Sequence, residues 1–433
     1  MTPLAIGIWC SVGLLVLMLL RIPIAVALIL TASAGIWAVQ GSFAAFFQLA
    51  GAPINSTSYG LSVIPLFILM GNLAVHAGLS RDLFALASRA IGRLRGGLAV
   101  ATILGCAGFS ALSGSSLATA ATMGKVTLGE MHRRGYSRRL ASGSVAAGGT
   151  IGILIPPSVM LAIYALMTEQ SIRDMFAAGL FPGLMLTGVF VLTVLIWVRL
   201  SPGAAPSATD LTALDARVSA GGVLALVGLV VLVLGGLYGG FFTPTEAAAV
   251  GAIGTFAIAL VRGGMGWPNF REAMIDSATT SGMIFLIIIG STLYGTFLAV
   301  TGIAGALRGF VGGLDASPMA VLVVILLIYV VLGFVMDALG MLLLTLPVLY
   351  PIVIQVGIDP ILFGVLVVMA VELGLITPPL GMNVFVVRSI APDTPLSQIF
   401  AGAAPFALSF VVAIGIVLAW PALATWLPGA LYR

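Results

Sequence analysis

The chain has 433 residues, of which 61% are hydrophobic and 7% charged, and its formal net charge is +4. A chain this apolar cannot fold in water and is typical of a polytopic helical membrane protein, for which a bacterial inner membrane is the natural location. The basic residues lie at the edges of apolar segments, so the net charge does not indicate nucleic-acid binding. Cys10 and Cys106 lie within apolar segments, which predicts two buried thiols and no disulfide.

The first part of the chain contains apolar spans and two amphipathic pieces. Residues 79–95 (LSRDLFALASRAIGRLR) alternate apolar and basic side chains at helical spacing, which predicts an interfacial arm helix bound to anionic membrane lipid on the cytoplasmic side. The spans before it are expected at residues 4–20, 22–39 and 60–77, with a weaker amphipathic piece at 41–58.

Residues 97–130 are apolar, but small and polar residues fill their centre, which reads GFSALSGSSLATAAT. Arginines flank the segment on both sides, and clustered arginines stay on the cytoplasmic side of a membrane. Each limb has only about 15 residues, which as a helix would rise roughly 22 Å, less than the roughly 30 Å hydrocarbon core. The sequence therefore predicts an inner re-entrant hairpin with SGSS at its tip. Non-helical backbone at membrane depth has to be buried or to line a cavity, so the tip is a candidate binding site.

The rest of the chain continues with spans, and a pair of prolines breaks two of them. The first broken helix is expected at residues 140–166, with its break at IPPS, and the second at 360–387, with its break at ITPPLGMN. Residues 200–217 form the longest polar stretch and are expected to be a cytoplasmic linker. The other expected elements are spans at 180–199, 218–239, 243–262, 280–300 and 396–420, and a long apolar block at 317–356 with GFVMDALGM at its centre.

The elements on the two sides of the linker follow the same order, which divides the chain into residues 1–199 and 218–433. No basic cluster flanks the long apolar block of the second half, so we expect it to be an outer hairpin that opens from the outside. Threading the spans with both hairpins places both termini on the periplasmic side and leaves only Arg173, Arg308 and Arg433 outside among the 18 Lys and Arg residues. The expected fold class is an all-α polytopic membrane protein with inverted repeats, two re-entrant hairpins and two Pro-Pro broken helices, which is typical of secondary transporters.

The two hairpin tips and the two proline breaks are four places where backbone groups lack helical partners. Free carbonyl oxygens can coordinate a small hard cation, whereas helix N-termini and serine hydroxyls can hold a carboxylate. Ser115, Ser158 and Asn383 are the candidate substrate-binding residues. The alternative is that these small residues only let helices pack closely. The candidate cation ligands are Ser113, Gly114, Ser116, Gly149, Thr150 and Pro156 in the first half and Gly333, Asp337, Gly340, Thr377, Pro378 and Gly381 in the second.

Three acidic residues are expected at membrane depth, where ionisable side chains are costly and usually functional. Asp337 lies in the outer hairpin and Glu372 precedes the second proline break, and we expect both to be functional. Glu246 follows Pro244 at the start of a span, where a role as a helix cap fits at least as well. The sequence shows no metal-binding cluster, phosphate loop or nucleophile with a histidine base. We therefore expect neither an enzyme nor an ATP-driven pump, and an ion gradient has to supply the energy.

Five segments of the chain closely resemble the large permease subunit of tripartite ATP-independent periplasmic (TRAP) transporters, the DctM family. They read GFSALSGSSLATAA, GGTIGILIPPS, FFTPTEAAAVGA, FVMDALGMLLLTLPVLYPI and ELGLITPPLGMNVFVV, and they are spread over nearly the whole chain. The resemblance implies an elevator-type transporter, in which hairpins and broken helices carry the substrate across a fixed scaffold. It also implies coupling to sodium ions bound at the hairpin tips.

The resemblance further implies two protein partners, a small four-helix membrane subunit of the DctQ type and a periplasmic substrate-binding protein of the DctP type. Because the chain starts directly at the large-subunit pattern, the small subunit is expected to be a separate protein. Family members carry C4-dicarboxylates, sialic acids, other sugar acids and keto acids, so we expect a small organic anion as substrate. Two alternatives stay open: a self-sufficient ion-coupled organic anion transporter without a binding protein, and a non-transporting membrane scaffold or sensor.

Overall fold

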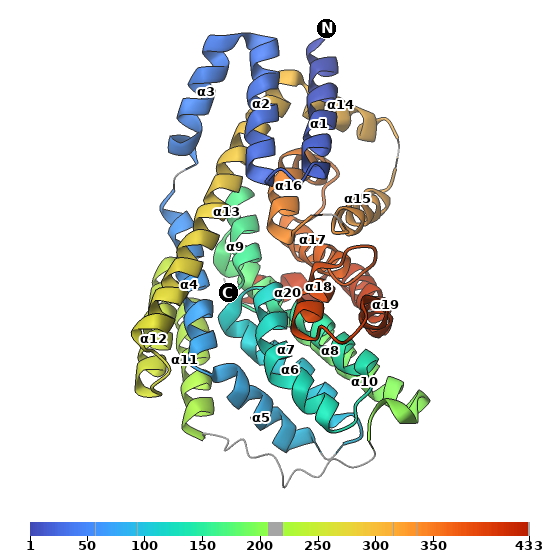
Figure 1. Ribbon diagram of the computed structural model, residues 1–433. Coiled ribbons are helices and arrows are strands. Elements are labelled where there is room, and N and C mark those ends of the chain that lie inside the picture. Colours follow the sequence, from blue (N-terminus) through green and yellow to red (C-terminus); the bar gives the residue numbers. More distant parts are fainter. Residues whose placement is uncertain (57, 93, 207–219, 315, 335, 432–433) are drawn as a thin grey trace.

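The computed structural model describes residues 1–56, 58–92, 94–206, 220–314, 316–334 and 336–431 (Figure 1). Within these ranges the chain is all-α and contains no β-strand. Seven of the described helices are long and apolar enough to cross a membrane. The chain is therefore a multi-pass membrane protein, as its composition predicts.

One group of helices packs around α13 (Trp267–Thr301), which has 35 residues. Helix α13 lies along α2 (Ile24–Gln40) and α4 (Val63–His76), and α12 (Pro244–Val261) packs against α4. Figure 1 shows α4, α11, α12 and α13 along one side of the molecule. The other members of this group are α1 (Pro3–Leu19), α3 (Ser42–Asn55), η1 (Tyr59–Ser62), α11 (Ala220–Tyr238) and α14 (Ile303–Gly312).

A second group of helices contains the predicted hairpins, the two proline breaks and the helices around them. The inner hairpin consists of α6 (Gly97–Ser113) and α7 (Ser116–Arg133), and the outer one of α15 (Pro318–Leu332) and α16 (Ala338–Gln355). The broken segments are α8 (Arg138–Thr150), η2 (Ile151–Ile153) and α9 (Val159–Met167), and later α17 (Pro360–Gly374) and α18 (Met382–Ile390). The group is completed by α10 (Ile172–Leu200), α19 (Leu396–Ala419) and α20 (Ala422–Ala430).

Aromatic side chains fill the core of this second group. The ring of Phe190 on α10 lies 5.5 Å from that of Phe406 and 5.8 Å from that of Phe410, both on α19 and both in edge-to-face geometry. Tyr164 on α9 and Phe363 on α17 have ring centroids 6.3 Å apart. Such pairs add to the stabilisation that comes from burial itself. The helices next to the two proline breaks are therefore held in one packed block.

Polar side chains at chain breaks fix where many of the helices begin. The hydroxyls of Ser137, Ser158, Ser171 and Ser317 each accept a hydrogen bond from a backbone N–H in the first turn of the helix that follows. Asp359 accepts two such bonds at the start of α17. A cap of this kind stabilises a helix by about 1 kcal/mol. The short polar residues between apolar segments thus define the helix ends that surround the site.

The arm helix α5 (Leu79–Ile91) lies across the lower end of the molecule in Figure 1. It ends before the predicted boundary at residue 95, because Gly92 caps it and Gly96 adopts a left-handed backbone conformation with φ of +80°. Its Asp82 side chain is nearly buried and forms an ion pair with Arg262 at the end of α12, at an N···O distance of 2.6 Å. The arm also packs along α6 (Gly97–Ser113), so it contacts both that helix and the helix group around α13.

Several elements differ from the predicted spans. Helix α13 begins at Trp267, before the expected start at residue 280, and the short helices α14 and α20 do not follow from the apolar pattern. The start of the predicted linker forms η3 (Pro202–Ala204), and the Ala204 carbonyl accepts a hydrogen bond from Ser137 N at 3.0 Å. Residues 207–217 of the predicted linker lie outside the described residues.

Candidate functional site

The tip of the inner hairpin is a short turn between two helices. Helix α6 ends at Ser113, and Gly114 follows with φ of +56°, which is the left-handed region that favours glycine. Ser115 then caps α7, because its hydroxyl oxygen accepts a hydrogen bond from Ala118 N at 3.4 Å. The Ser113 hydroxyl lies 2.6 Å from the hydroxyl of Thr119 on α7. Local hydrogen bonds therefore hold both sides of the tip together.

The inner tip lies directly against the first proline break, which contains a cis peptide bond between Pro156 and Pro157. A Cβ atom placed on Gly114 would lie 2.9 Å from the carbonyl oxygen of Pro157. A Cβ atom on Gly152 would likewise lie 2.7 Å from the carbonyl oxygen of Ser115. Real Cβ atoms do not approach backbone oxygens so closely, so glycine is required at both positions. The backbone of the tip and the backbone of the break are in direct contact.

The second half of the chain repeats this local arrangement with different residues. Asp337 caps α16, because its carboxylate accepts a hydrogen bond from Gly340 N at 3.0 Å. A Cβ atom on Gly333, where α15 ends, would lie 3.0 Å from the Cα atom of Gly374, where α17 ends. The second break has a cis bond between Pro378 and Pro379, and Gly381 then adopts φ of +57° before α18. Again a hairpin lies against a broken helix.

A cavity of about 470 Å³ separates the two hairpin tips. The tip residues from Ser113 to Ser116 line one side, and Asp337 with the two residues after it lines another. Helices α4 and α13 complete the wall with Asn72, Met283 and other side chains. None of the described lining residues is basic. The full lining is Ile68, Gly71, Asn72, Ser113, Gly114, Ser115, Ser116, Leu117, Ala118, Ile153, Val159, Met160, Thr280, Met283, Ile284, Asp337, Ala338, Leu339, Leu375 and Met382.

The three candidate substrate residues occupy different places. Ser115 lines the cavity. Ser158 is fully buried behind it, and its hydroxyl oxygen accepts a hydrogen bond from Leu161 N at 3.2 Å and so caps α9. Asn383 is also fully buried, and its side-chain amide donates to the carbonyl oxygen of Ala146 on α8 at 3.4 Å. Neither Ser158 nor Asn383 is among the lining residues, so only Ser115 of this set is positioned to touch a ligand in the cavity.

The candidate cation ligands fall into two layers. Ser113, Gly114, Ser116 and Asp337 line the cavity. The others lie behind the lining, at the ends of the broken helices or of the outer hairpin. Two of their hydroxyls bond within their own helix, since Thr150 donates to Ala147 O and Thr377 donates to Leu373 O, both at 2.6 Å. The members of this outer layer are Gly149, Thr150, Pro156, Gly333, Gly340, Thr377, Pro378 and Gly381.

The two remaining acidic candidates lie in contrasting environments. Glu246 is exposed at the start of α12, where its carboxylate accepts a hydrogen bond from Thr243 N at 2.8 Å and the Thr243 hydroxyl accepts one from Glu246 N at 3.3 Å. This reciprocal pair is a capping box, so the structure accounts for Glu246 by helix stability alone. Glu372 on α17 is fully buried, and its carboxyl lies next to the side chain of Ser116.

Two polar residues of the cavity wall were missed by sequence reasoning. The side-chain amide of Asn72 on α4 donates a hydrogen bond to the Ser277 hydroxyl on α13 at 2.9 Å. Thr280 lines the same wall one turn further along α13. Neither residue belongs to a motif, because each is a single polar residue in an apolar helix. The only signal in the sequence is that each is polar, with Asn72 inside the predicted span 60–77 and Thr280 at the start of the predicted span 280–300.

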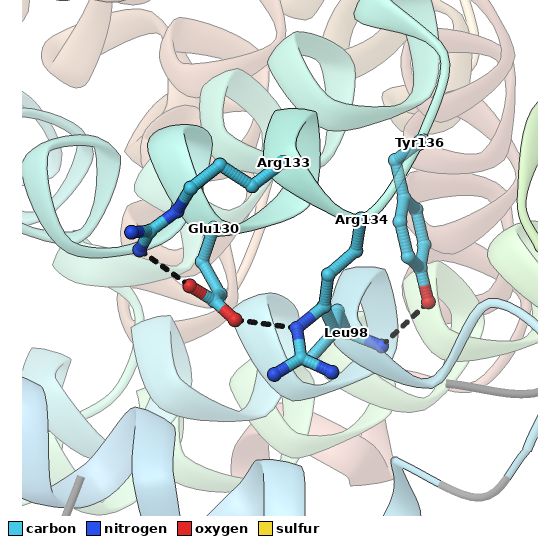
Figure 2. A network of polar contacts seen from close by, with 5 residues as sticks. All are labelled: Leu98, Glu130, Arg133, Arg134 and Tyr136. Atoms are coloured by element: carbon cyan, nitrogen blue, oxygen red, sulfur yellow. Dashed lines mark hydrogen bonds and ion pairs between the residues drawn. The ribbon is translucent and has the colours of Figure 1, made fainter. Parts of the chain in front are cut away.

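A polar network holds the base of the inner hairpin, at the end opposite to the tip (Figure 2). Glu130 forms ion pairs with both Arg133, at 2.6 Å, and Arg134. The Tyr136 hydroxyl accepts a hydrogen bond from Leu98 N at 3.1 Å and so links the start of α6 to the chain that follows α7. Nearby, burial lowers the pKa of His132, and the positive charge of Arg138 lowers it further. The hydrogen bond between Leu98 and Tyr136 therefore closes the base of the hairpin, and the ion pairs of Glu130 stabilise the end of α7.

Comparison with known proteins identifies the family. Residues 11–423 match the family described as Tripartite ATP-independent periplasmic transporter, DctM component. The chain is 36% identical over 377 residues to the C4-dicarboxylate TRAP transporter large permease protein DctM of Pseudomonas aeruginosa, which covers 86% of this chain and 87% of that protein. It is 32% identical over 403 residues to the sialic acid TRAP transporter large permease protein SiaM of Vibrio cholerae, and this match covers 93% of this chain and 91% of that protein. The crystal structure of the Alcanivorax borkumensis YdaH transporter has the same fold, with a TM-score of 0.65 at 15% identity over 98% of this chain and 100% of that one. The chain therefore belongs to the DctM family of TRAP transporters, and it is a transporter permease component rather than an enzyme.

Proposed function

We propose that this chain is the large permease of a TRAP transporter that takes up a small organic anion, driven by a sodium gradient. The observation that carries the proposal is the cavity of about 470 Å³ between the two hairpin tips. The relative from Pseudomonas aeruginosa is named for C4-dicarboxylates and that from Vibrio cholerae for sialic acid, and both are organic acids. A C4-dicarboxylate, a sialic acid or another sugar acid or keto acid is the proposed class of substrate.

The inner tip can bind a carboxylate through hydrogen-bond donors, although no basic side chain is among the described residues that line the cavity. Helix α7 has 18 residues and begins at the cavity, so its macrodipole and the N–H groups of its first turn favour an anion there. Ser115 caps the helix by accepting a hydrogen bond, which leaves its hydroxyl proton for a ligand. The substrate carboxylate is therefore proposed to bind at Ser115 and at the N–H groups of the first turn of α7.

The charge of the cavity supports coupling to a cation. Asp337 is acidic and none of the described lining residues is basic, so an anion that enters alone meets electrostatic repulsion. Sodium ions bound with the substrate would remove that repulsion. Carbonyl and hydroxyl oxygens are the ligands that a small hard cation prefers. The candidate cation ligands at the two tips and breaks keep that role in the proposal, with Ser113, Gly114, Ser116 and Asp337 nearest to the cavity.

The proposed mechanism is an elevator in which the second helix group moves against the group around α13. Two observations support it. Close backbone contacts at Gly114 and at Gly333 bind each hairpin to a broken helix, so the second group can move as one body. The arm α5 packs along α6 of the inner hairpin and is also joined to α12 through the ion pair of Asp82 with Arg262, and because of this ion pair the proposal places it in the fixed part. We further propose that residues 1–199 and 218–433 are inverted repeats, with the hairpins opening to opposite faces of the bacterial inner membrane and both termini in the periplasm.

The proposal includes two protein partners, a DctQ-type small permease subunit and a DctP-type periplasmic binding protein that delivers the substrate. Family membership supports both. The alternative is a self-sufficient sodium-coupled anion transporter, which would need no binding protein. No partner of another kind, such as nucleic acid, is proposed.

The test is uptake of labelled organic acids into proteoliposomes that contain the chain with its small subunit. Uptake that requires both an inward sodium gradient and the binding protein is the expected result. Uptake without the binding protein would favour the self-sufficient transporter. Uptake that does not depend on sodium would contradict the proposed cation sites.

A matched pair of variants tests the role of the inner tip. Ser115→Ala and Ser317→Ala each remove a serine that caps a helix through a bond of 3.4 or 3.3 Å, so each loses about 1 kcal/mol of helix stability. Ser115 lines the cavity, whereas Ser317 is exposed at the start of α15. Only Ser115→Ala is expected to raise the substrate concentration needed for half-maximal uptake. Equal effects of the two variants would show that the tip does not contact substrate.

A further inference from the structure

Glu372 is a buried carboxyl group without a hydrogen-bond partner. It lies in the last turn of α17 and is 0% exposed, and neither carboxyl oxygen has a partner among the described residues. The ion pairs found in the described part of the chain involve Glu130 and Asp82 but not Glu372. A buried charge without a partner costs many kcal/mol, so this carboxyl has to be neutralised by something other than a protein side chain.

The end of α17 at Glu372 meets the start of α7, and the end of α8 and the start of α18 contact these two helix ends. The Ser116 side chain at the start of α7 lies next to the carboxyl, and a single neutral hydroxyl cannot balance a negative charge. Behind Ser116, a Cβ atom on Gly149 at the end of α8 would lie 3.1 Å from the Ser116 carbonyl oxygen. Asn383, at the start of α18, donates its backbone N–H to the carbonyl oxygen of Leu375 at 3.1 Å. Residues from both halves of the chain therefore meet around this carboxyl.

A second unsatisfied oxygen belongs to the same group of helix ends. The Asn383 side chain is 0% exposed and donates to Ala146 O, but its carbonyl oxygen has no partner among the described residues. Buried polar atoms without partners are rare in folded proteins and require an explanation. Carboxylate, amide and hydroxyl oxygens are hard ligands, and no thiol, imidazole or ammonium group is paired with them. This chemistry fits a small monovalent cation.

We propose that Glu372 binds a further sodium ion behind the tip of the inner hairpin. The site is distinct from the cavity, because Ser116 and Leu375 line the cavity and Glu372 does not. A cation here neutralises the carboxyl and holds α7 of the first half to α17 of the second. The inference rests on the proposed function, in which the same group of helices carries cations with the substrate.

The experiment compares Glu372→Gln with Glu272→Gln in the complex with the small subunit, purified and placed in lipid nanodiscs. Gln keeps the size of Glu but cannot hold a cation by charge, and Glu272 is an exposed residue at the beginning of α13. Equilibrium binding of radioactive sodium is measured without any transport step. In parallel, a pH-indicator dye in weak buffer reports protons released when sodium is added, and sodium-induced difference infrared spectra report protonated carboxyl groups.

A sodium site predicts that Glu372→Gln binds one sodium ion fewer per chain than the wild type, while Glu272→Gln does not. Where sodium displaces a proton from Glu372, the wild type also releases that proton and loses a protonated-carboxyl band, and both signals are absent in Glu372→Gln. Glu372→Asp, which keeps the charge on a shorter side chain, is expected to retain the response with affinity reduced on the order of tenfold, about 1.4 kcal/mol. This variant also serves if Glu372→Gln does not fold.

Two outcomes would overturn the inference. One is sodium binding and proton release in Glu372→Gln identical to those of the wild type. The other is a protonated-carboxyl band at Glu372 that never responds to sodium, which would make the group a permanently neutral core residue. The proposed function fails separately, in wild-type uptake that does not depend on sodium, so the two failures are distinguishable.

Discussion

Gly114 offers the sharpest test of how the inner hairpin tip is built. Its φ of +56° lies in the left-handed region, where a residue with a Cβ atom costs about 1–2 kcal/mol. In addition, a Cβ atom there would lie 2.9 Å from Pro157 O and 3.3 Å from Val159 N, and both are backbone atoms that cannot rotate away. Forcing an extra methyl group into packed structure costs about 1–3 kcal/mol more. Gly114→Ala is therefore expected to destabilise the tip by about 2–5 kcal/mol.

The control for this variant is Gly135→Ala, in the turn between α7 and α8. Gly135 has φ of +78°, but a Cβ atom there would have nothing within 4 Å. The control thus carries the conformational cost of about 1–2 kcal/mol without the steric one. Thermal unfolding in detergent compares the stability of the two variants, and uptake in proteoliposomes compares their transport. We expect Gly114→Ala to be the less stable and to lose sodium-stimulated uptake. Equal stability, or normal uptake by Gly114→Ala, would refute the close contact between tip and break.

Three further predictions concern other parts of the molecule. Asp82→Asn should lower the free energy of unfolding by about 1–3 kcal/mol, because it leaves Arg262 without its ion pair. Adding Arg262→Gln should restore part of the lost stability. Thermal unfolding that shows no coupling between the two substitutions would contradict this. Glu246→Gln should transport normally, because Gln also completes a capping box, and a large loss of uptake would show a direct role. The lowered pKa of His132 means that the unfolded chain binds this proton more tightly, so the stability due to neutral His132 is present above the ordinary pKa of about 6.5 and falls on acidification below it. The variant His132→Gln should lose this acid sensitivity in thermal unfolding measured across pH, and an unchanged pH profile would contradict the assignment.

The sequence predicts those features that local backbone chemistry decides. The run SGSS and the two proline pairs interrupt helices by themselves, and the structure has helix ends at Ser113 and Thr150, with new helices starting at Ser116 and Val159. The starts and ends of several amphipathic or polar helices are less predictable. Helix α13 extends before residue 280 because Trp267 and the polar residues after it continue the helix beyond the apolar part that defined the predicted span.

The side chains of the site are harder to predict, because one residue type serves two purposes. A serine before a helix can cap that helix, bind a ligand or do both. Ser115 and Ser158 both cap, yet only Ser115 reaches the cavity, since Ser158 is covered on all sides. Which of the two faces open space depends on tertiary packing. The same holds for Asn72 and Thr280, whose position on the wall follows only from how α4 and α13 face the tips.

The two helix groups meet at the inner tip, where the proposed elevator would need one group to slide past the other. A Cβ atom on Gly71 of α4 would lie 3.0 Å from Ser113 O and 3.1 Å from its Cα atom, so α4 and the tip meet backbone to backbone. A side chain at this position would interlock with the tip and resist sliding. Glycine at this position adds no side chain to the contact, whereas within the second group Gly114 approaches the break and Gly152 of the break approaches the tip. Glycines therefore allow close backbone contacts on both sides of the tip, and in the proposed elevator the contact with α4 at Gly71 is the one that has to slide.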